Sequence, residues 1–562
     1  MGKKKSVFAF IVVVLGFLMA LLDTTIVNIT LPKMTEYFKT DLERISWVIN
    51  GYNLAFAVLL LTAARLADQF GRKKIFLIGV ALFVVSSYLS GISETVDWLI
   101  FFRVVQGLAA AFVVPVTIPL AVGLFPNNRG AVMGVWGAMA GLAAAGGPAL
   151  GGFLSSSLHW QWIFFINVPV GIVTVTGAYF LLKESYDSSA GKKIDWGGIS
   201  SLSAGMFALT LGLIQANDTG WTSAYILTLF AIAFISFVVF IQIELKSAEP
   251  MLPLWMLKIW PFSFGSATLF VVGVGLMCGS FLLAFFLTQM LGMSELEAGL
   301  TISAMPLVSM VFSAVCGPFS DKVGNRWFST LGMVLFGIGI FSFSGLSADS
   351  TRVDVVWRLM IAGAGMGMTM APTIGATVRA VPFDKVGISS GVTNMTRTIG
   401  MVLGVAVLVT LFNVYTEKQV TVAKDKAVSV VQSSKELNAR AKKKMVQQLR
   451  KAEFTQQNQG PEQKDILQNI NNAEKQTLAS VPDGKKAAVK KRFEQQKKTV
   501  KRLWPKIRET FTGAVVDAFS ATFKWGSLFV LMGAVFAFFS DPSRSGRKEV
   551  EQDVYNKKVE AN

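Results

Sequence analysis

The sequence contains very little histidine, cysteine and charge. A single histidine, His159, and two cysteines, Cys278 and Cys316, occur among 562 residues, and only 16% of the side chains are charged. One histidine excludes a histidine-based metal site and a histidine proton relay, and two cysteines in apolar segments exclude a disulfide scaffold. Acids are also scarce, because 35 Asp and Glu stand against 53 Lys and Arg. We therefore expect no metal and no cofactor.

Apolar residues are abundant instead. Hydrophobic side chains make up 52% of the chain, as in polytopic membrane proteins. A run of ~20 apolar residues suffices to cross a bilayer as a helix. The first run follows three lysines like a signal peptide, but it is too long and has no small-residue cleavage site, so we expect it to be retained. Fourteen spans are predicted, at about 7–31, 45–66, 75–93, 98–122, 131–154, 161–182, 197–216, 222–243, 262–289, 298–316, 328–346, 354–378, 387–414 and 520–540.

The distribution of basic residues predicts the orientation of these spans. With the N-terminus in the cytoplasm, the cytoplasmic termini and loops carry 21 basic residues, whereas the short outer loops carry four. Positive charge is retained on the cytoplasmic side of membranes, so we expect both termini in the cytoplasm. The long segment 416–510 then lies outside, because long loops translocate regardless of their charge.

Asp23, in the first span, is the acid that lies deepest in any predicted span. It is about eight residues from the outer end, or about 12 Å at ~1.5 Å per residue. An ionised carboxylate at the centre of such a helix costs roughly 2.5–3.5 kcal/mol on insertion scales. Two interpretations are open. Asp23 is either a capping or paired acid inside a bundle, or a proton or cation site that faces a cavity.

Two arginines also lie within predicted spans. Arg103, in the fourth span, is about five residues inside the outer boundary, at a depth comparable to that of Asp23. Buried arginines usually face the bundle interior and pair, so Asp23 and Arg103 are the predicted couple. The alternative is that Arg103 extends to the outer surface. Arg397, about ten residues deep in the thirteenth span and close to Asn394, is a second cation that needs a partner.

One motif occurs twice. Residues 65–74 follow the second span and residues 318–326 follow the tenth, 253 residues later. Both place an Asp, two residues and then Gly with basic residues in a short turn, which Gly permits. Duplicated halves are typical of transporters, so spans 1–6 and 9–14 are the predicted halves and spans 7–8 an inserted pair. Two unrelated tight turns are the alternative.

The fifth span is rich in small residues. Glycines and alanines crowd residues 141–152, and such helices pack backbone to backbone. A proline within the run frees a carbonyl and permits a bend. Glycine-rich packing helices occur in many membrane proteins, so this pattern alone indicates close packing and nothing more.

The segment 416–510 holds 23 basic and 10 acidic residues. A helix start near Ser433, with apolar residues at 437, 441, 445 and 449, predicts an amphipathic helix. A polar break follows at 456–461, and the apolar pattern then resumes. We expect a basic helical hairpin outside the cell, drawn to anionic lipid headgroups. A solvated or disordered charge run is the alternative.

Together these motifs resemble a known family. Residues 22–32 are similar to the first-helix motif of the fourteen-span drug:proton antiporters, QacA- and EmrB-like, of the major facilitator superfamily. Residues 68–74 resemble the signature turn of the superfamily, 103–107 its fourth-helix motif, and 147–152 the fifth-helix motif associated with exporters. Segments 160–169 and 250–254 also fit. The resemblance covers nearly all of 7–415 and the last span.

The resemblance implies an all-α major facilitator fold. Its parts would be an N-terminal bundle (1–185), inserted helices (186–250), a C-terminal bundle (251–415), the basic insert (416–510), and the last helix with a tail (511–562). The implied function is proton-coupled efflux of amphipathic or lipophilic compounds across the plasma membrane, with no enzymatic step and no nucleic-acid partner.

The same resemblance assigns roles to particular residues. Proton coupling falls to Asp23 and Arg103, and gating to Asp68, Gly71, Arg72 and Asp321. Antiporter-motif packing falls to Gly147, Pro148, Gly151 and Gly152. The substrate pathway is expected at Asn28, Gln106, Phe285, Met305, Met310, Met366, Asn394 and Arg397. Methionine is polarizable and suits a promiscuous surface, although a Met at helical spacing is more often core.

Two departures from the family pattern bear on the substrate. Members that export dications carry further acids in their C-terminal spans, whereas the tenth and thirteenth spans here show none. The insert 416–510 is also unusually long and basic. An exporter or flippase dedicated to a lipid or signalling metabolite is therefore the alternative function. A non-transporting receptor or scaffold would need no buried acid, and a membrane enzyme would need a nucleophile, a metal set or an acid pair, which the sequence does not show.

Overall fold

The computed structural model describes residues 3–541 apart from 41, 127, 187–193, 248–249, 383–384, 435–436, 438, 452–453, 456–457 and 460–462. At Asn28, Pro148 and Asp321 it describes the backbone but not the side chain. The described chain forms two compact units. The first comprises Met1–Phe343, Thr351–Val407 and Trp525–Asn562, and the second comprises Ser344–Ser350 and Leu408–Lys524.

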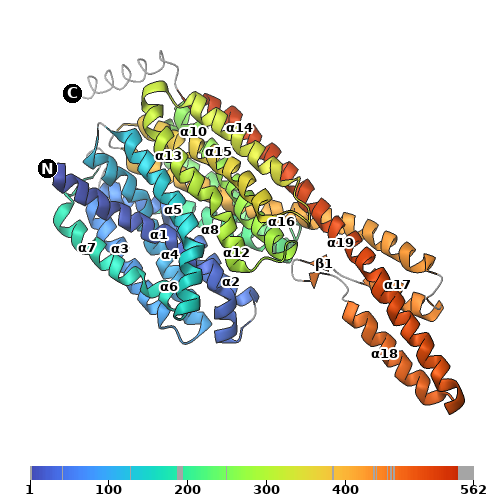
Figure 1. The fold of residues 1–562 in the computed structure, drawn as a ribbon. Helices are drawn as coiled ribbons and strands as arrows, with labels where there is room; N and C mark the ends of the chain where they lie inside the picture. Colours follow the sequence, from blue (N-terminus) through green and yellow to red (C-terminus); the bar gives the residue numbers. More distant parts are fainter. Residues whose placement is uncertain are drawn as a thin grey trace, which may run out of the picture. The chain divides into compact units, whose positions relative to one another are not determined.

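Apolar helices build the first unit (Figure 1). Its first half contains α1 (Lys3–Phe38), α2 (Leu42–Phe70), α3 (Arg72–Gly91), α4 (Val96–Leu124), α5 (Arg129–Ser157), α6 (Trp162–Phe165) and α7 (Asn167–Leu181). The inserted pair is α8 (Trp196–Thr219) and α9 (Ala224–Lys246), followed by the short 3₁₀ helix η1 (Leu254–Lys258).

The second half begins with α10 (Trp260–Met277), the π-helical turn η2 (Cys278–Leu282) and α11 (Leu283–Gln289). It continues with α12 (Glu295–Ile302), α13 (Ala304–Val323), α14 (Arg326–Phe343) and α15 (Arg352–Arg379). It is completed by the apolar parts of α16 (Val386–Ser433) and α19 (Asp483–Phe539), which are long helices shared with the second unit.

The predicted number of spans is confirmed. Fourteen helices among the described residues are long and apolar enough to cross a membrane, and each overlaps one predicted run. Local sequence explains several helix ends. Ser294 with Glu297 and Thr351 with Asp354 form capping boxes at the starts of α12 and α15, where side chains satisfy the free N–H groups of a first turn. The fold class is therefore the all-α class expected from the sequence.

The two halves meet along α5 and α13, which lie side by side. Glycines on α5 make this approach possible. A Cβ added at Gly141 would lie 2.6 Å from the carbonyl oxygen of Pro306, and one added at Gly137 would lie 2.7 Å from Ser313 Cβ. The small residues of the fifth span thus serve the close packing that the sequence indicated.

On another face α5 packs against α1. Thr25 Oγ1, on α1, donates a hydrogen bond to the carbonyl of Ala143 at 3.1 Å. A Cβ added at Gly147 would lie only 1.9 Å from that same Oγ1. Side chains larger than hydrogen at position 147 therefore compete directly with the α1–α5 contact.

The second unit has its own hydrophobic core. Its helices are the C-terminal part of α16, α17 (Ala439–Lys451), α18 (Gln463–Ser480) and the N-terminal part of α19. Leu437, Met445 and Leu449, which form the apolar stripe expected from the sequence, are buried there with Val500 and Phe511. Strands β1 (Phe454–Thr455) and β2 (Asn458–Gln459) form a two-residue antiparallel pair. The insert thus contains more than the predicted hairpin, because the flanking helices α16 and α19 share its core.

We expect Gly147→Leu to destabilise the protein by about 1–3 kcal/mol, the usual cost of overpacking a filled interior. The measurement is thermal unfolding of the purified protein in detergent. Gly123→Ala is the matched control, because a Cβ at Gly123 meets no atom within 4 Å. Equal stability of the Gly147 variant and the control would contradict the proposed close contact between α1 and α5.

Candidate functional site

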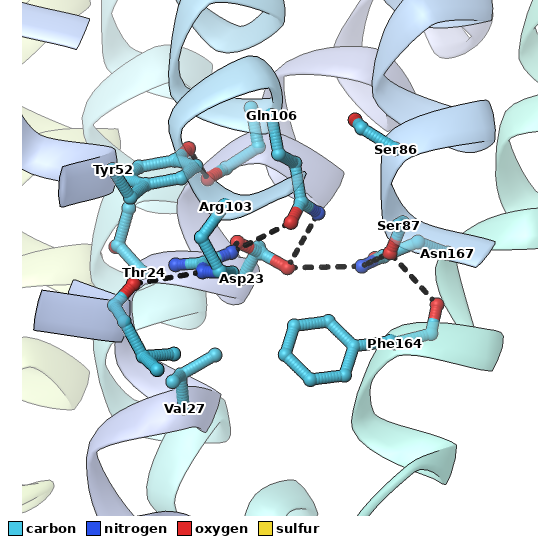
Figure 2. A network of polar contacts seen from close by, with 12 residues as sticks. Asp23, Thr24, Val27, Tyr52, Ser86, Ser87, Arg103, Gln106, Phe164 and Asn167 are labelled. Atoms are coloured by element: carbon cyan, nitrogen blue, oxygen red, sulfur yellow. Dashed lines mark hydrogen bonds and ion pairs between the residues drawn. The ribbon is translucent and has the colours of Figure 1, made fainter. Parts of the chain in front are cut away.

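Asp23 and Arg103 form an ion pair inside the first half (Figure 2). Arg103 Nη1, on α4, donates to Asp23 Oδ2, on α1, and both residues are only 1% exposed. The structure therefore joins the two residues that the sequence paired by depth. A buried pair of this kind is costly to break, because removal of one partner leaves an uncompensated charge that costs roughly 3–5 kcal/mol.

The second carboxylate oxygen of Asp23 is held from two further positions. Gln106 Nε2 donates to Asp23 Oδ1 at 3.0 Å, and Asn167 Nδ2 donates to the same oxygen at 3.1 Å. Asn167 lies at the start of α7 and also donates to Ser87 Oγ, on α3, at 3.0 Å. The carboxylate is therefore bound to side chains of α4 and α7, and Asn167 connects it to α3.

Arg103 is held equally closely. Its Nε donates to the carbonyl of Val48 at 3.0 Å, and its Nη1 also donates to Gln106 Oε1 at 2.7 Å. The guanidinium lies over the Tyr52 ring, 4.3 Å from its centroid. Tyr52, on α2, in turn donates to the carbonyl of Ala20 at 3.3 Å. A change of charge on Asp23 would therefore alter the contacts between four helices of the first half.

Asn167, Ser87 and Tyr52 were not selected from the sequence. The signal for Asn167 was available, because this polar amide stands within the apolar segment 160–169 that matches the family motif. Ser87 and Tyr52 carry no comparable signal, because serine and tyrosine are common in apolar helices and their roles depend on which neighbours they meet.

A second ionic group lies where α2 ends. Arg72 Nε donates to Asp68 Oδ1 at 2.8 Å, and both side chains are buried. The Asp68 carboxylate also faces the first turn of α16, because a Cβ added at Gly387 would lie 2.3 Å from Asp68 Oδ1. An acid at a helix N-terminus is favoured by the helix dipole. Asp68 thus links the first half to the second.

The turn between α2 and α3 depends on Gly71, whose φ of 115° favours glycine. Glu184, just after α7, closes this turn. Its Oε1 accepts from the Lys73 amide at 2.9 Å and its Oε2 from the Lys74 amide at 3.2 Å. These two N–H groups belong to the first turn of α3, which has no intrahelical acceptor for them.

The corresponding turn of the second half is closed in the same way. Gly324 has a φ of 101°. Asp541, just after α19, accepts from the backbone amides of Asn325 at 2.7 Å and Arg326 at 3.2 Å, at the start of α14. The internal repeat thus includes two carboxylates that the sequence analysis did not select. Each follows the last span of its half, where an acid is indistinguishable from an ordinary solvated loop charge.

The other predicted residues are placed as follows. Gly151 is buried on α5, and a Cβ on Gly152 would lie 2.6 Å from Leu296. Pro148, Asn28 and Asp321 lie within α5, α1 and α13, but their side chains are outside the described part of the structure. Their expected roles in packing, pathway and gating therefore stay predictions.

The expected pathway residues of the second half lie on four helices, α11, α13, α15 and α16. Met305 and Met366 are buried, and Met305 packs on Gly279 within the π-helical turn. Met310 packs on Gly141, and Phe285 is half-buried on α11. Arg397 donates to Asn394 Oδ1 at 3.4 Å. A cavity of about 470 Å³ between α10, α16 and α19 is lined by none of these residues.

Fourteen spans in two repeated halves, with an ionisable pair buried in the first half, define a polytopic secondary transporter. The family model described as Major Facilitator Superfamily matches residues 13–405, and the chain belongs to that superfamily.

Several curated proteins are similar to this chain. The Tetracenomycin C resistance and export protein of Streptomyces glaucescens is 33% identical over 398 residues, which are 70% of this chain and 74% of that protein. Multidrug resistance protein 3 of Bacillus subtilis is 30% identical over 73% of this chain and 80% of its own length. The multidrug transporter protein MdtP of Bacillus subtilis is 27% identical over 553 residues, 97% of this chain and 95% of its own, so that similarity extends through the insert.

Among solved structures, the human organic anion transporter MFSD10 (TETRAN) is similar in fold. The TM-score is 0.51 at 15% identity, over 72% of this chain and 93% of that one. At this identity the likeness concerns the fold alone.

We expect Glu184→Ala and Asp541→Ala each to lower stability by about 1–2 kcal/mol, because each removes a carboxylate from a helix N-terminus and leaves two amides without their acceptor. Thermal unfolding in detergent is the measurement. Asp349→Ala, at an exposed loop acid, is the control and should change little. Unchanged unfolding of both test variants would show that these carboxylates do not hold the turns.

Proposed function

We propose that the chain is a proton-coupled exporter of amphipathic or lipophilic compounds. The observation that carries the proposal is the Asp23 carboxylate, buried, paired with Arg103 and hydrogen-bonded from two helices other than its own. The names of relatives support the cargo, because they describe resistance to and export of tetracenomycin C, multidrug resistance, and resistance to methylenomycin A. The proposed cycle has no covalent step, and membership of the Major Facilitator Superfamily supports a transporter rather than an enzyme.

Protonation of Asp23 supplies the coupling. The ionised carboxylate compensates the charge of Arg103, and its neutral form does not. Arg103 would then be a buried cation without its counter-ion, a state that costs several kcal/mol unless the helices rearrange. Since the network joins α1, α2, α4 and α7, uptake or release of one proton biases the position of these helices. A substrate that favours one arrangement is thereby linked to the proton gradient.

The proposed orientation places both termini in the cytoplasm of a cell whose plasma membrane holds the protein, as the distribution of basic residues predicts. The Asp68–Arg72 pair and the two glycine turns then lie on the cytoplasmic side. In the structure Asp68 rests against the start of α16, a contact that must part when the pathway opens inward. Asp68, Gly71 and Arg72 accordingly act as a cytoplasmic gate, with Asp321 as the proposed counterpart in the second half.

The insert is the proposed contact with anionic lipid headgroups. Its surplus of basic over acidic residues is 13 across 416–510, and most of its described large apolar side chains pack into its own core. The exposed surface is therefore the charged one. Each basic residue near an anionic membrane surface contributes about 1 kcal/mol of attraction, and salt screens it.

We expect Asp23→Asn to abolish uphill, proton-driven efflux while the protein remains folded. Asn keeps the size of the side chain but cannot take up a proton, so substrate binding can persist without coupling. The measurement is transport of a cationic dye in proteoliposomes with an imposed pH gradient, together with dye binding to the same variant.

Asp97→Asn is the matched control for this experiment. Asp97 forms an exposed ion pair with Arg44 at 2.8 Å, and such pairs contribute only about 0–1 kcal/mol. Normal uphill transport by the Asp23 variant would exclude Asp23 as the coupling group.

We expect a triple change of Lys490, Lys491 and Arg492 to Gln to weaken adsorption of the protein to anionic vesicles and to leave dye efflux unchanged. All three side chains are exposed on α19. Adsorption of detergent-solubilised protein to vesicles with and without anionic lipid, at two salt concentrations, is the measurement. Equal adsorption of variant and wild-type protein would exclude this surface as the lipid contact.

A further inference from the structure

A second buried ionic cluster joins the inserted helices to the end of α2. Its first member is Glu244, in the last turn of α9, which is 4% exposed. Glu244 Oε1 accepts from the Met251 amide at 3.1 Å, and Oε2 accepts from the Leu252 amide at 3.2 Å. The segment 250–254, which matches the family pattern but has no role in the proposed cycle, is therefore folded around this carboxylate.

The second member is Asp195, the residue before α8. Its Oδ1 accepts from the Gly198 amide at 2.8 Å and so caps the helix, but its Oδ2 is buried without a hydrogen-bond partner among the described residues. A Cβ added at Gly198 would lie 2.6 Å from Asp195 Oδ2 and 3.1 Å from Glu244 Oε1. Both carboxylates thus pack against the same side of Gly198.

The third member is Arg65 of α2, which is 4% exposed. Within the described part of the chain its Nε and Nη1 atoms have no hydrogen-bond partner, although its charge acts on Glu244. Helix α8 packs against α2, and the hydroxyls of Thr62 on α2 and Ser203 on α8 also lack partners there. Buried donors and acceptors without partners are destabilising, so mere packing does not explain this polar set.

We propose that Asp195, Glu244 and Arg65 form an auxiliary proton-binding site, through which the inserted helices α8 and α9 control the end of α2 that carries the gate residue Asp68. The ligand is a proton, taken up by the carboxylate pair from water on the side of the membrane where α2 ends. Two ionised carboxylates beside one arginine leave an excess negative charge in a buried space, and one shared proton removes it.

The surrounding charges favour this assignment. On the elements that meet here, α2 contributes Arg65, α9 contributes Glu244 and Asp195 caps the start of α8. The segment 250–254 donates only backbone amides. The nearest ionic neighbours after Arg65 in the sequence are Asp68, on α2, and Arg72, at the start of α3, and these two pair with each other. Protonation weakens the attraction of the carboxylates for Arg65, which lies three residues before Asp68 on the same helix.

The consequence is regulation of the gate by pH, separate from the proton that Asp23 carries. This consequence rests on the proposed function, because it assumes that α2 moves when the pathway opens. The protonation itself does not, and it can be measured on protein that transports nothing.

The first test is a pH titration of the purified protein, followed by infrared difference spectroscopy of the protonated carboxyl band. All variants carry Asp23→Asn, so that Asp23 contributes no signal. The parent should show a titrating carboxyl band. Glu244→Gln should remove or displace it, and Asp195→Asn, which retains a capping side chain, should displace its midpoint by about one pH unit or more. Glu297→Gln is the control, because Gln also serves in a capping box.

A parent without a titrating band, or a band identical in the parent, Glu244→Gln and Asp195→Asn, would overturn the proton site. Since Asn and Gln preserve size and polarity, correct folding is checked by the unfolding temperature of each variant, and Asp195→Asn remains informative if Glu244→Gln unfolds.

The second test measures dye efflux by proteoliposomes that retain Asp23, at a constant pH gradient and several absolute pH values. The wild-type initial rate should change several-fold with pH, and the change should be lost in Glu244→Gln and in Arg65→Gln but retained in Arg65→Lys. Identical profiles in wild type and Glu244→Gln would overturn control of the gate. A titrating band in protein that never transports the dye would instead contradict the proposed function and leave the site intact.

Discussion

The buried pair of Asp23 and Arg103 is the interaction on which the first half depends. Neither charge can be removed alone without leaving the other unpaired in a low-dielectric interior. Further hydrogen bonds to the pair come from Gln106, Asn167 and the carbonyl of Val48. An acid that costs several kcal/mol to bury is thus stabilised by Arg103, Gln106 and Asn167, which come from two other helices. Because these groups form one hydrogen-bonded network, the protonation state of Asp23 depends on the positions of the helices that carry them.

Much of this arrangement could be predicted because the membrane penalises charge so strongly. Asp23 and Arg103 were each costly alone and lay at similar depth, so their pairing followed from elementary electrostatics. Gln106 was expected in the substrate pathway, and the structure shows that it also binds the Asp23 carboxylate. No role was expected for Asn167, since a neutral amide costs little enough in an apolar span to occur there without a partner. Glu184 and Asp541 lie outside the spans, where burial exerts no penalty and acids are common, so only the folded turns revealed them.

In the insert, too, the periodicity of the sequence predicts a helix face but not what that face packs against. The four-residue spacing of Leu437, Ala441, Met445 and Leu449 predicted one apolar stripe, and Leu437, Met445 and Leu449 are buried. Such a stripe can be buried against a membrane surface, against a hairpin partner or within a larger helical core. The sequence does not distinguish these environments. Val420, Val500 and Phe511, from the two long helices, complete the core. The environment of the stripe is decided by contacts between residues far apart in the sequence, such as Val420 and Phe511.

The carboxylates of Glu184 and Asp541 affect how each half can move. Each ties the last helix of a half to the start of the third helix of that half, so a contact distant in sequence closes the six-helix chain on itself. A chain closed in this way resists shear between its own helices, and its softest degrees of freedom then lie where one half meets the other. The motion of lowest energy is then a rigid-body rotation of the two halves about the contact between α5 and α13.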